Sequence, residues 1–212
     1  MVASLDETNE VVFPTPCWVS YPEIVKLAGG TPVPAKTSAE NGFILQPEEL
    51  RAVLTHKTKW LMLNSPSNPT GAVYSRKNLE DLAEVLRDYP NVWILSDDIY
   101  EHLVYGDVSF ATIAKIALDL AARTLTVNGV SKAYAMTGWR VGYAAGPIEL
   151  IKAMNTVQGQ STSHTCSIAQ HAAVEALTGD QTFIQEFKKT YKARRDLIVD
   201  MLNKIPGLSC DL

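Results

Sequence analysis

Cysteines are scarce in this sequence, and their spacing excludes a covalent framework. The 212 residues include only Cys17, Cys166 and Cys210, with no CxxC pair and no cysteine–histidine spacing typical of zinc ligands. An odd number of widely separated thiols differs from the paired cysteines of small secreted domains. We therefore expect reduced thiols, no metal site and a cytoplasmic protein.

The chain also lacks an excess of positive charge, a long apolar run and a leader. Its formal net charge of −4 argues against a nucleic-acid partner, because proteins that bind nucleic acid usually show a basic excess or stripe. The densest basic stretch, residues 188–195, lies between Glu186 and Asp196 in a helical pattern, which is typical of a solvated helix face. No apolar run approaches the roughly 18 residues of a membrane helix. Residues 1–10 are acidic and have no apolar core, unlike a signal peptide.

What the sequence does contain is an alternation of strand-like and helix-like runs. Hydrophobic residues make up 46% and charged residues 20%, the balance of a globular protein with a sizeable core. We predict strands at 11–13, 59–63, 91–96, 124–128 and 139–145, and helices at 21–28, 47–55, 76–88, 110–122, 148–154, 168–177 and 182–204. Continuous apolar strands are expected when helices cover both faces of a parallel sheet. The predicted fold class is α/β, a three-layer α/β/α arrangement around a mostly parallel sheet that is incomplete on its N-terminal side.

Polar residues follow the three central predicted strands. Asn68, Asp97 and Lys132 each come shortly after one of these strands, with enough chain between them for one strand–helix–strand unit. Parallel strands end at the same edge of a sheet, and open α/β sheets bind ligands at that edge, where the strand order reverses. The three residues are therefore predicted to share one site.

The residue types at this edge suit a cofactor with an aldehyde and a pyridine ring. A lysine amine forms an imine with an aldehyde, so Lys132 is a candidate to bind pyridoxal phosphate (PLP) as a Schiff base. Asp97 would pair with the ring nitrogen and keep it protonated, which PLP needs in order to act as an electron sink. Tyr100 and Asn68 would donate hydrogen bonds to the ring oxygen.

The phosphate of such a cofactor has two candidate partners. The planar fork of Arg140 matches a phosphate, and Ser131 would add a hydroxyl. Each residue alone also has an ordinary structural explanation. Lys132 would be a surface lysine, Asp97 a helix cap and Asn68 part of a turn. Only the ordered set favours a cofactor site.

Four segments carry a family resemblance. They are PTPCWVSYPE (14–23), NSPSNPTGAVY (64–74), SDDIYEHLVYG (96–106) and NGVSKAYAMTGWRVGYAAGP (128–147). In this order they resemble the class I PLP-dependent aminotransferases with the aspartate aminotransferase fold. The similarity is to the bacterial-type aspartate aminotransferases, a subgroup that includes enzymes accepting prephenate. It covers nearly the whole chain beyond residues 1–8.

The resemblance implies three catalytic residues. Lys132 would form the Schiff base and move the substrate proton, Asp97 would pair with the pyridinium nitrogen, and Tyr100 would contact the ring oxygen. The implied reaction moves an amino group between aspartate and 2-oxoglutarate in a homodimer. Other reactions remain open: a prephenate or aromatic aminotransferase, a carbon–sulfur lyase, or a non-catalytic fragment.

Four further residues would bind cofactor or substrate by the same resemblance. Asn68 would contact the ring oxygen and the substrate's α-carboxylate. Trp18 would stack on the cofactor ring and line the substrate site. Arg140 would bind the phosphate, with Ser131 beside it.

Several features depart from that family. Cys17 stands where tyrosine is common, and Asp98 stands where glutamate is usual. The family's N-terminal portion and C-terminal small domain have no counterpart, so we expect a chain truncated at both ends. We predict a tail at 1–8, the incomplete PLP-binding large domain at 9–180, a long connecting helix at 181–205 and the start of the small domain at 206–212.

Overall fold

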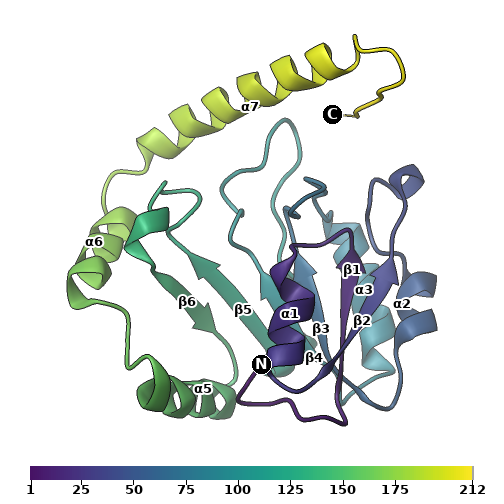
Figure 1. Ribbon diagram of the computed structural model, residues 1–212, viewed down its shortest axis with the longest axis vertical. Coiled ribbons are helices and arrows are strands. Elements are labelled where there is room, and N and C mark those ends of the chain that lie inside the picture. Colours follow the sequence, from purple (N-terminus) through teal and green to yellow (C-terminus); the bar gives the residue numbers. More distant parts are fainter. Residues whose placement is uncertain (212) are drawn as a thin grey trace.

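A computed structural model describes residues 1–211, which contain a single six-stranded sheet (Figure 1). The strands are β1 (Glu10–Thr15), β2 (Thr31–Lys36), β3 (Thr58–Asn64), β4 (Trp93–Asp97), β5 (Thr124–Gly129) and β6 (Gly142–Ala145). Their spatial order is β2-β1-β3-β4-β5-β6, and every neighbouring pair is parallel except β5 and β6. The mostly parallel sheet predicted from the sequence is confirmed.

Helices cover both faces of this sheet and complete the three layers. The α-helices in residues 1–211 are α1 (Ser20–Leu27), α2 (Pro47–Val53), α3 (Arg76–Arg87), α4 (Ile113–Ile116), α5 (Ile148–Ser161), α6 (Ser167–Thr178) and α7 (Thr182–Leu202). Helices α2, α3 and α4 pack on one face, and α1 and α5 pack on the other. No helix in residues 1–211 combines the length and the apolar character needed to cross a membrane.

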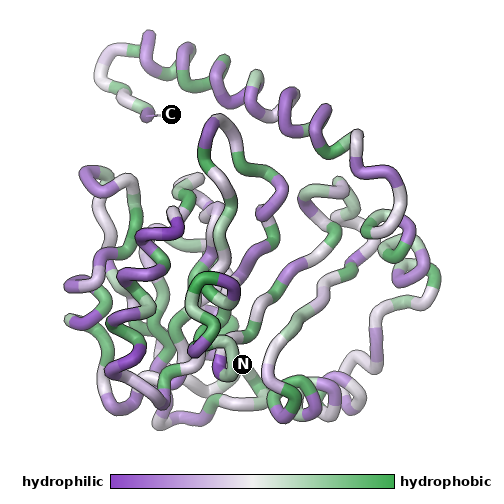
Figure 2. Tube along the Cα trace, turned by 180° about the vertical axis from the view of Figure 1, so that it is seen from behind, coloured by the Kyte–Doolittle hydropathy of each residue, from purple (hydrophilic) through white to green (hydrophobic). Residues whose placement is uncertain are grey.

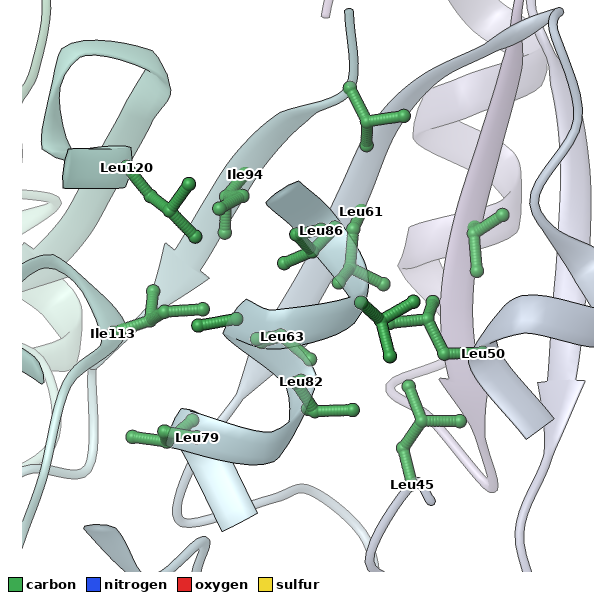
Figure 3. Close-up of a cluster of buried hydrophobic side chains, with 14 of the residues drawn as sticks. Leu45, Leu50, Leu61, Leu63, Leu79, Leu82, Leu86, Ile94, Ile113 and Leu120 are labelled. Atoms are coloured by element: carbon green, nitrogen blue, oxygen red, sulfur yellow. The ribbon is translucent and has the colours of Figure 1, made fainter. Parts of the chain in front are cut away.

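Strand β3 shows how the sequence builds two cores. Leu61 and Leu63 face the cluster beneath α2 and α3 (Figure 3), whereas Trp60 and Met62 face the cluster beneath α1. Alternate side chains of a strand point to opposite faces, so a continuous apolar run supplies both. The central strands are thereby held with their carboxyl ends at one edge.

Strand β2 was missed in the sequence analysis because Pro32 and Pro34 lie within it. Proline cannot donate a ladder hydrogen bond and is confined to positions such as edge strands. Here β2 is an edge strand, paired only with β1. Strand β1 also runs past its predicted end, through Pro14 to Thr15, because beyond Val12 it pairs with β2 alone and Pro14 need not donate to β3.

Two predicted elements are broken in the structure. The helix expected at 110–122 divides into α4 and a 3₁₀ helix at Leu118–Arg123, because Ala117 leaves the helical conformation (φ −117°, ψ 79°). The strand expected at 139–145 begins only at Gly142, since Arg140 adopts a left-handed conformation (φ 56°) after a 3₁₀ turn. Residues 208–211 form no strand, and Leu212 lies outside the described residues.

Helix α7 extends over the edge at which the parallel strands end (Figure 1). At its start, Ile184 packs with Tyr134 and Ala173 in a third, smaller apolar cluster. Further along, the guanidinium of Arg195 lies 5.3 Å from the ring centroid of Tyr105, in the loop that follows β4. Hydrophilic and hydrophobic residues alternate along this helix (Figure 2).

Candidate active site

The carboxyl ends of β3, β4 and β5 meet at one edge, with Asn64, Asp97 and Val127 in register. Asp97 is the last residue of β4, and Asn68 and Lys132 follow β3 and β5 after a short stretch of chain. Because β2 and β3 lie on opposite sides of β1, the strand order reverses beside β1, the usual position of a ligand site.

The carboxylate of Asp97 is held by donors from two different elements. Its Oδ2 accepts a hydrogen bond from the Tyr21 hydroxyl at 2.6 Å, and its Oδ1 accepts one from the Ile99 amide at 3.3 Å. Burial raises the pKa of Asp97, while these two hydrogen bonds and the charge of Lys132 act in the opposite direction. Within residues 1–211, no lysine, arginine or histidine forms an ion pair with it. A bound cation would stabilise the ionised form of this partly buried carboxylate.

Lys132 and Tyr100 lie together beside Asp97. The Lys132 Nζ is 5.6 Å from the centroid of the Tyr100 ring, and both side chains are partly exposed. A cation at this distance is attracted to the face of the ring. The three residues predicted to be catalytic are therefore brought together from the end of β4 and the loops after β4 and β5.

Trp18 lies at the same edge because it follows β1. Its ring stands edge-on to Tyr21, with the centroids 5.6 Å apart and an interplanar angle of 86°. The side chain is 42% exposed, so its ring is available to a ligand. Tyr21 in turn connects Trp18 to Asp97.

Asn64 connects two of the predicted site residues, and the sequence analysis did not select it. Its Nδ2 donates to the backbone oxygen of Asp97, and its Oδ1 accepts from the backbone amide of Asn68, each at 2.9 Å. Tyr21 was also missed, because a tyrosine near the start of an amphipathic helix reads as a core residue. Tyr21 and Asn64 lie inside two of the family-like segments, 14–23 and 64–74, and this was the signal that could have identified them.

Arg140 and Ser131 lie on the segment between β5 and β6. The exposed Arg140 donates from Nη1 to the backbone oxygen of Thr137 at 2.9 Å. The backbone pairing of Val130 with Val141 brings the two ends of this segment together. Neither Arg140 nor Ser131 is hydrogen-bonded to Asp97 or Lys132 in the described part of the chain.

A cavity of about 530 Å³ lies at the opposite edge of the sheet. It is lined by residues that precede β1, β3 and β4 or begin these strands, and by none of the predicted site residues: Thr8, Asn9, His56, Lys57, Thr58, Lys59, Pro90, Asn91 and Trp93. Residues 1–211 hold no group of three or more histidine, cysteine or acidic side chains able to bind a metal ion. The chemistry of the carboxyl edge, rather than cavity size, identifies the candidate site.

Comparison with known proteins identifies a family for this chain. The family described as aminotransferase class I and II matches residues 1–211. The chain belongs to this family. An aspartate/prephenate aminotransferase of Cereibacter sphaeroides is 58% identical over 210 residues, which are 99% of this chain and 52% of that protein.

Solved structures of class I and II aminotransferases share the fold. The aspartate aminotransferase of Rhizobium meliloti has a TM-score of 0.97 at 54% identity, with 99% of this chain and 52% of that one covered. An aromatic aminotransferase of Pyrococcus horikoshii has a TM-score of 0.91 at 40% identity, with coverage of 96% and 54%. The chain thus spans about half the length of the aminotransferases it matches.

Proposed function

We propose that the protein is a PLP-dependent aminotransferase that moves an amino group between aspartate and 2-oxoglutarate, with Lys132 as the Schiff-base lysine. The observation that carries the proposal is the partly buried Asp97 carboxylate, which accepts from Tyr21 and lies near the Lys132 amine at the carboxyl edge of the sheet. The activity and substrates of the whole protein are part of this proposal, because the chain spans only about half the length of its relatives.

The donor set at this edge fits PLP. When bound, PLP supplies an electron sink that stabilises negative charge at the substrate's α-carbon. Asp97 would hold a proton on the ring nitrogen, and the resulting positive charge would offset the desolvation of the Asp97 carboxylate. Tyr100 and Asn68 would hold the ring oxygen, and Trp18 would cover one face of the ring.

Lys132 has two roles in this proposal. Its Nζ would first anchor the cofactor and, once displaced by the amino acid, would carry a proton at the substrate's α-carbon. Arg140 and Ser131 would bind the phosphate. Asn68 would also bind the substrate's α-carboxylate, with Trp18 beside it.

The names of the relatives support a substrate class. The Cereibacter sphaeroides protein is named for aspartate and prephenate, which favours aspartate as the amino donor. An aromatic amino acid is the second candidate, because the Pyrococcus horikoshii structure is described as an aromatic aminotransferase. We further propose a cytoplasmic homodimer in which residues 9–180 form the cofactor-binding domain, residues 1–8 a tail, 181–205 a connecting helix and 206–212 the start of a second domain.

Replacing the lysine tests the function. Full-length protein incubated with PLP and freed of excess should show near-visible absorbance that Lys132→Ala abolishes. Lys152→Ala removes an exposed lysine paired with Glu149 and should leave the absorbance unchanged. Retention of the wild-type spectrum by Lys132→Ala would contradict the Schiff-base assignment. Activity assays of the full-length protein with aspartate, prephenate and cystathionine would separate the alternative reactions.

A further inference from the structure

We propose that Asn64 is a positioning residue that fixes the separation between Asn68 and Asp97, and so allows both to reach the same cofactor ring. This inference rests on the proposed function. Asn64 is the last residue of β3 and is in register with Asp97, the last residue of β4. Its side chain is buried, with only 8% of the residue exposed.

The two hydrogen bonds of Asn64 require an amide. Its Nδ2 donates to the backbone oxygen of Asp97, and its Oδ1 accepts from the backbone amide of Asn68, both at 2.9 Å. An amide carries a donor and an acceptor on one planar group, so a single side chain ties the end of β4 to the loop after β3. An aliphatic side chain of similar size would leave both of these partly buried backbone groups without these partners.

The loop that contains Asn68 is held partly by hydrogen bonds of its own backbone. Within it, the Ser67 amide donates to the Ala72 oxygen and the Gly71 amide donates to the Ser67 oxygen, both at 2.9 Å. These internal bonds make residues 67–72 a compact unit. The bond from Asn68 to Asn64 links this unit to the same side chain that contacts the backbone of Asp97.

That relative position matters because the cofactor ring is rigid. In the proposed function Asp97 holds the ring nitrogen and Asn68 holds the ring oxygen, so one flat ring must meet both. A displacement of about 1 Å in a positioned group can reduce a rate by about a hundredfold. Loss of the Asn64 amide should thus weaken cofactor binding and turnover more than it weakens folding.

The test compares Asn64→Ala with Ser65→Ala in the full-length protein. Ser65 is the neighbouring buried residue, and its hydroxyl accepts from the Tyr74 amide at 3.0 Å without contacting Asp97 or Asn68. We expect Asn64→Ala to raise the Kd for PLP at least about tenfold, to reduce the rise in Tm caused by PLP, and to shift the pH at which the absorbance of bound PLP changes. Ser65→Ala should lower the Tm of the cofactor-free protein while leaving these three properties near wild type.

A second variant covers the case in which Asn64→Ala does not fold. Asn64→Ser can still satisfy one of the two backbone groups and should show a smaller rise in the same Kd. An unchanged Kd and pH dependence in a folded Asn64 variant, or equal losses in the Ser65→Ala protein, would overturn the positioning role. The proposed function would survive that result as long as Lys132→Ala abolishes the absorbance, so the two failures are distinguishable.

Discussion

The hydroxyl of Tyr21 donates to Oδ2 of Asp97 at 2.6 Å, joining the first turn of α1 to the end of β4. Burial, followed by the charge of Asp97, raises the pKa of Tyr21 well above its ordinary value. The Tyr21 hydroxyl therefore keeps its proton and remains a hydrogen-bond donor at neutral pH. A hydrogen bond to the charged form of a carboxyl favours that form, so Tyr21 helps to keep Asp97 ionised.

Tyr21→Phe should weaken the site without removing any residue predicted to touch the cofactor. Hydrogen bonds to charged groups are worth roughly 1.5–3 kcal/mol, so we expect kcat to fall roughly tenfold to a hundredfold. The pKa of Asp97 rises further when this donor is lost, and the acid limb of the rate profile should move to higher pH. Tyr74→Phe is the control, because its buried hydroxyl accepts from the Leu45 amide and does not contact Asp97. An acid limb at the wild-type pH in Tyr21→Phe would contradict this role.

Asp97→Ala should separate cofactor retention from turnover. Lys132 would still anchor PLP, so part of the near-visible absorbance should remain, whereas nearly all aminotransferase activity should be lost because nothing holds the ring proton. Asp98→Asn is the matched control, since Asp98 is a neighbouring buried carboxyl that accepts from Ser96 at 2.6 Å. Normal turnover in Asp97→Ala would exclude the pyridinium role.

The sequence predicted the positions of the central strands, and hence the edge of the sheet, because β3 and β4 are continuous apolar runs bounded by polar residues. It did not predict the roles of Tyr21 and Asn64. The direction of a side chain at the end of a strand or helix depends on the packing of distant elements, and Tyr21 meets Asp97 only after β1, β3 and β4 are assembled. The sequence also did not predict the left-handed conformation of Arg140, since residues other than glycine rarely adopt it.

Asp98 should make the stability of the protein depend on pH between about 4 and 6. Burial raises the pKa of Asp98 to about 6 from an ordinary 3.8, so the folded state holds this proton more tightly than the unfolded state. The stabilisation that this proton gives the folded state is complete below pH 3.8 and is lost as the pH rises through about 6. The free energy of unfolding therefore decreases by about 3 kcal/mol over this range. Urea unfolding at several pH values should show this decrease.

Asp98→Asn should remove that decrease from the unfolding free energy, because an amide does not ionise. Asp107→Asn, which removes an exposed carboxyl from the loop after β4, serves as the control and should retain the wild-type slope. A wild-type slope in Asp98→Asn would show that another buried group binds the proton.

Two glycines of the β5–β6 hairpin should differ sharply in their tolerance of alanine. A Cβ at Gly129 would lie 2.9 Å from the Val141 oxygen and 3.2 Å from the Gly142 Cα, so backbone would have to move. We expect Gly129→Ala to lower the free energy of unfolding by about 1–3 kcal/mol. At Gly142 the nearest atom would be 3.4 Å away, and alanine there should change the unfolding free energy by less than about 0.5 kcal/mol. Equal losses in denaturant titrations of the two variants would contradict the steric explanation.

The isolated chain of 212 residues should associate with itself at high concentration. Leu197, Ile198 and Met201 lie within five residues of one another on α7, and each is more than half exposed. Contiguous exposed apolar surface promotes association. Light scattering should therefore show an average mass that grows with concentration, and Leu197→Lys should reduce that growth. Ala193→Lys adds the same charge to an exposed site on α7 and should have less effect; a monomeric wild-type chain, or equal effects of the two substitutions, would show that this apolar surface does not drive association.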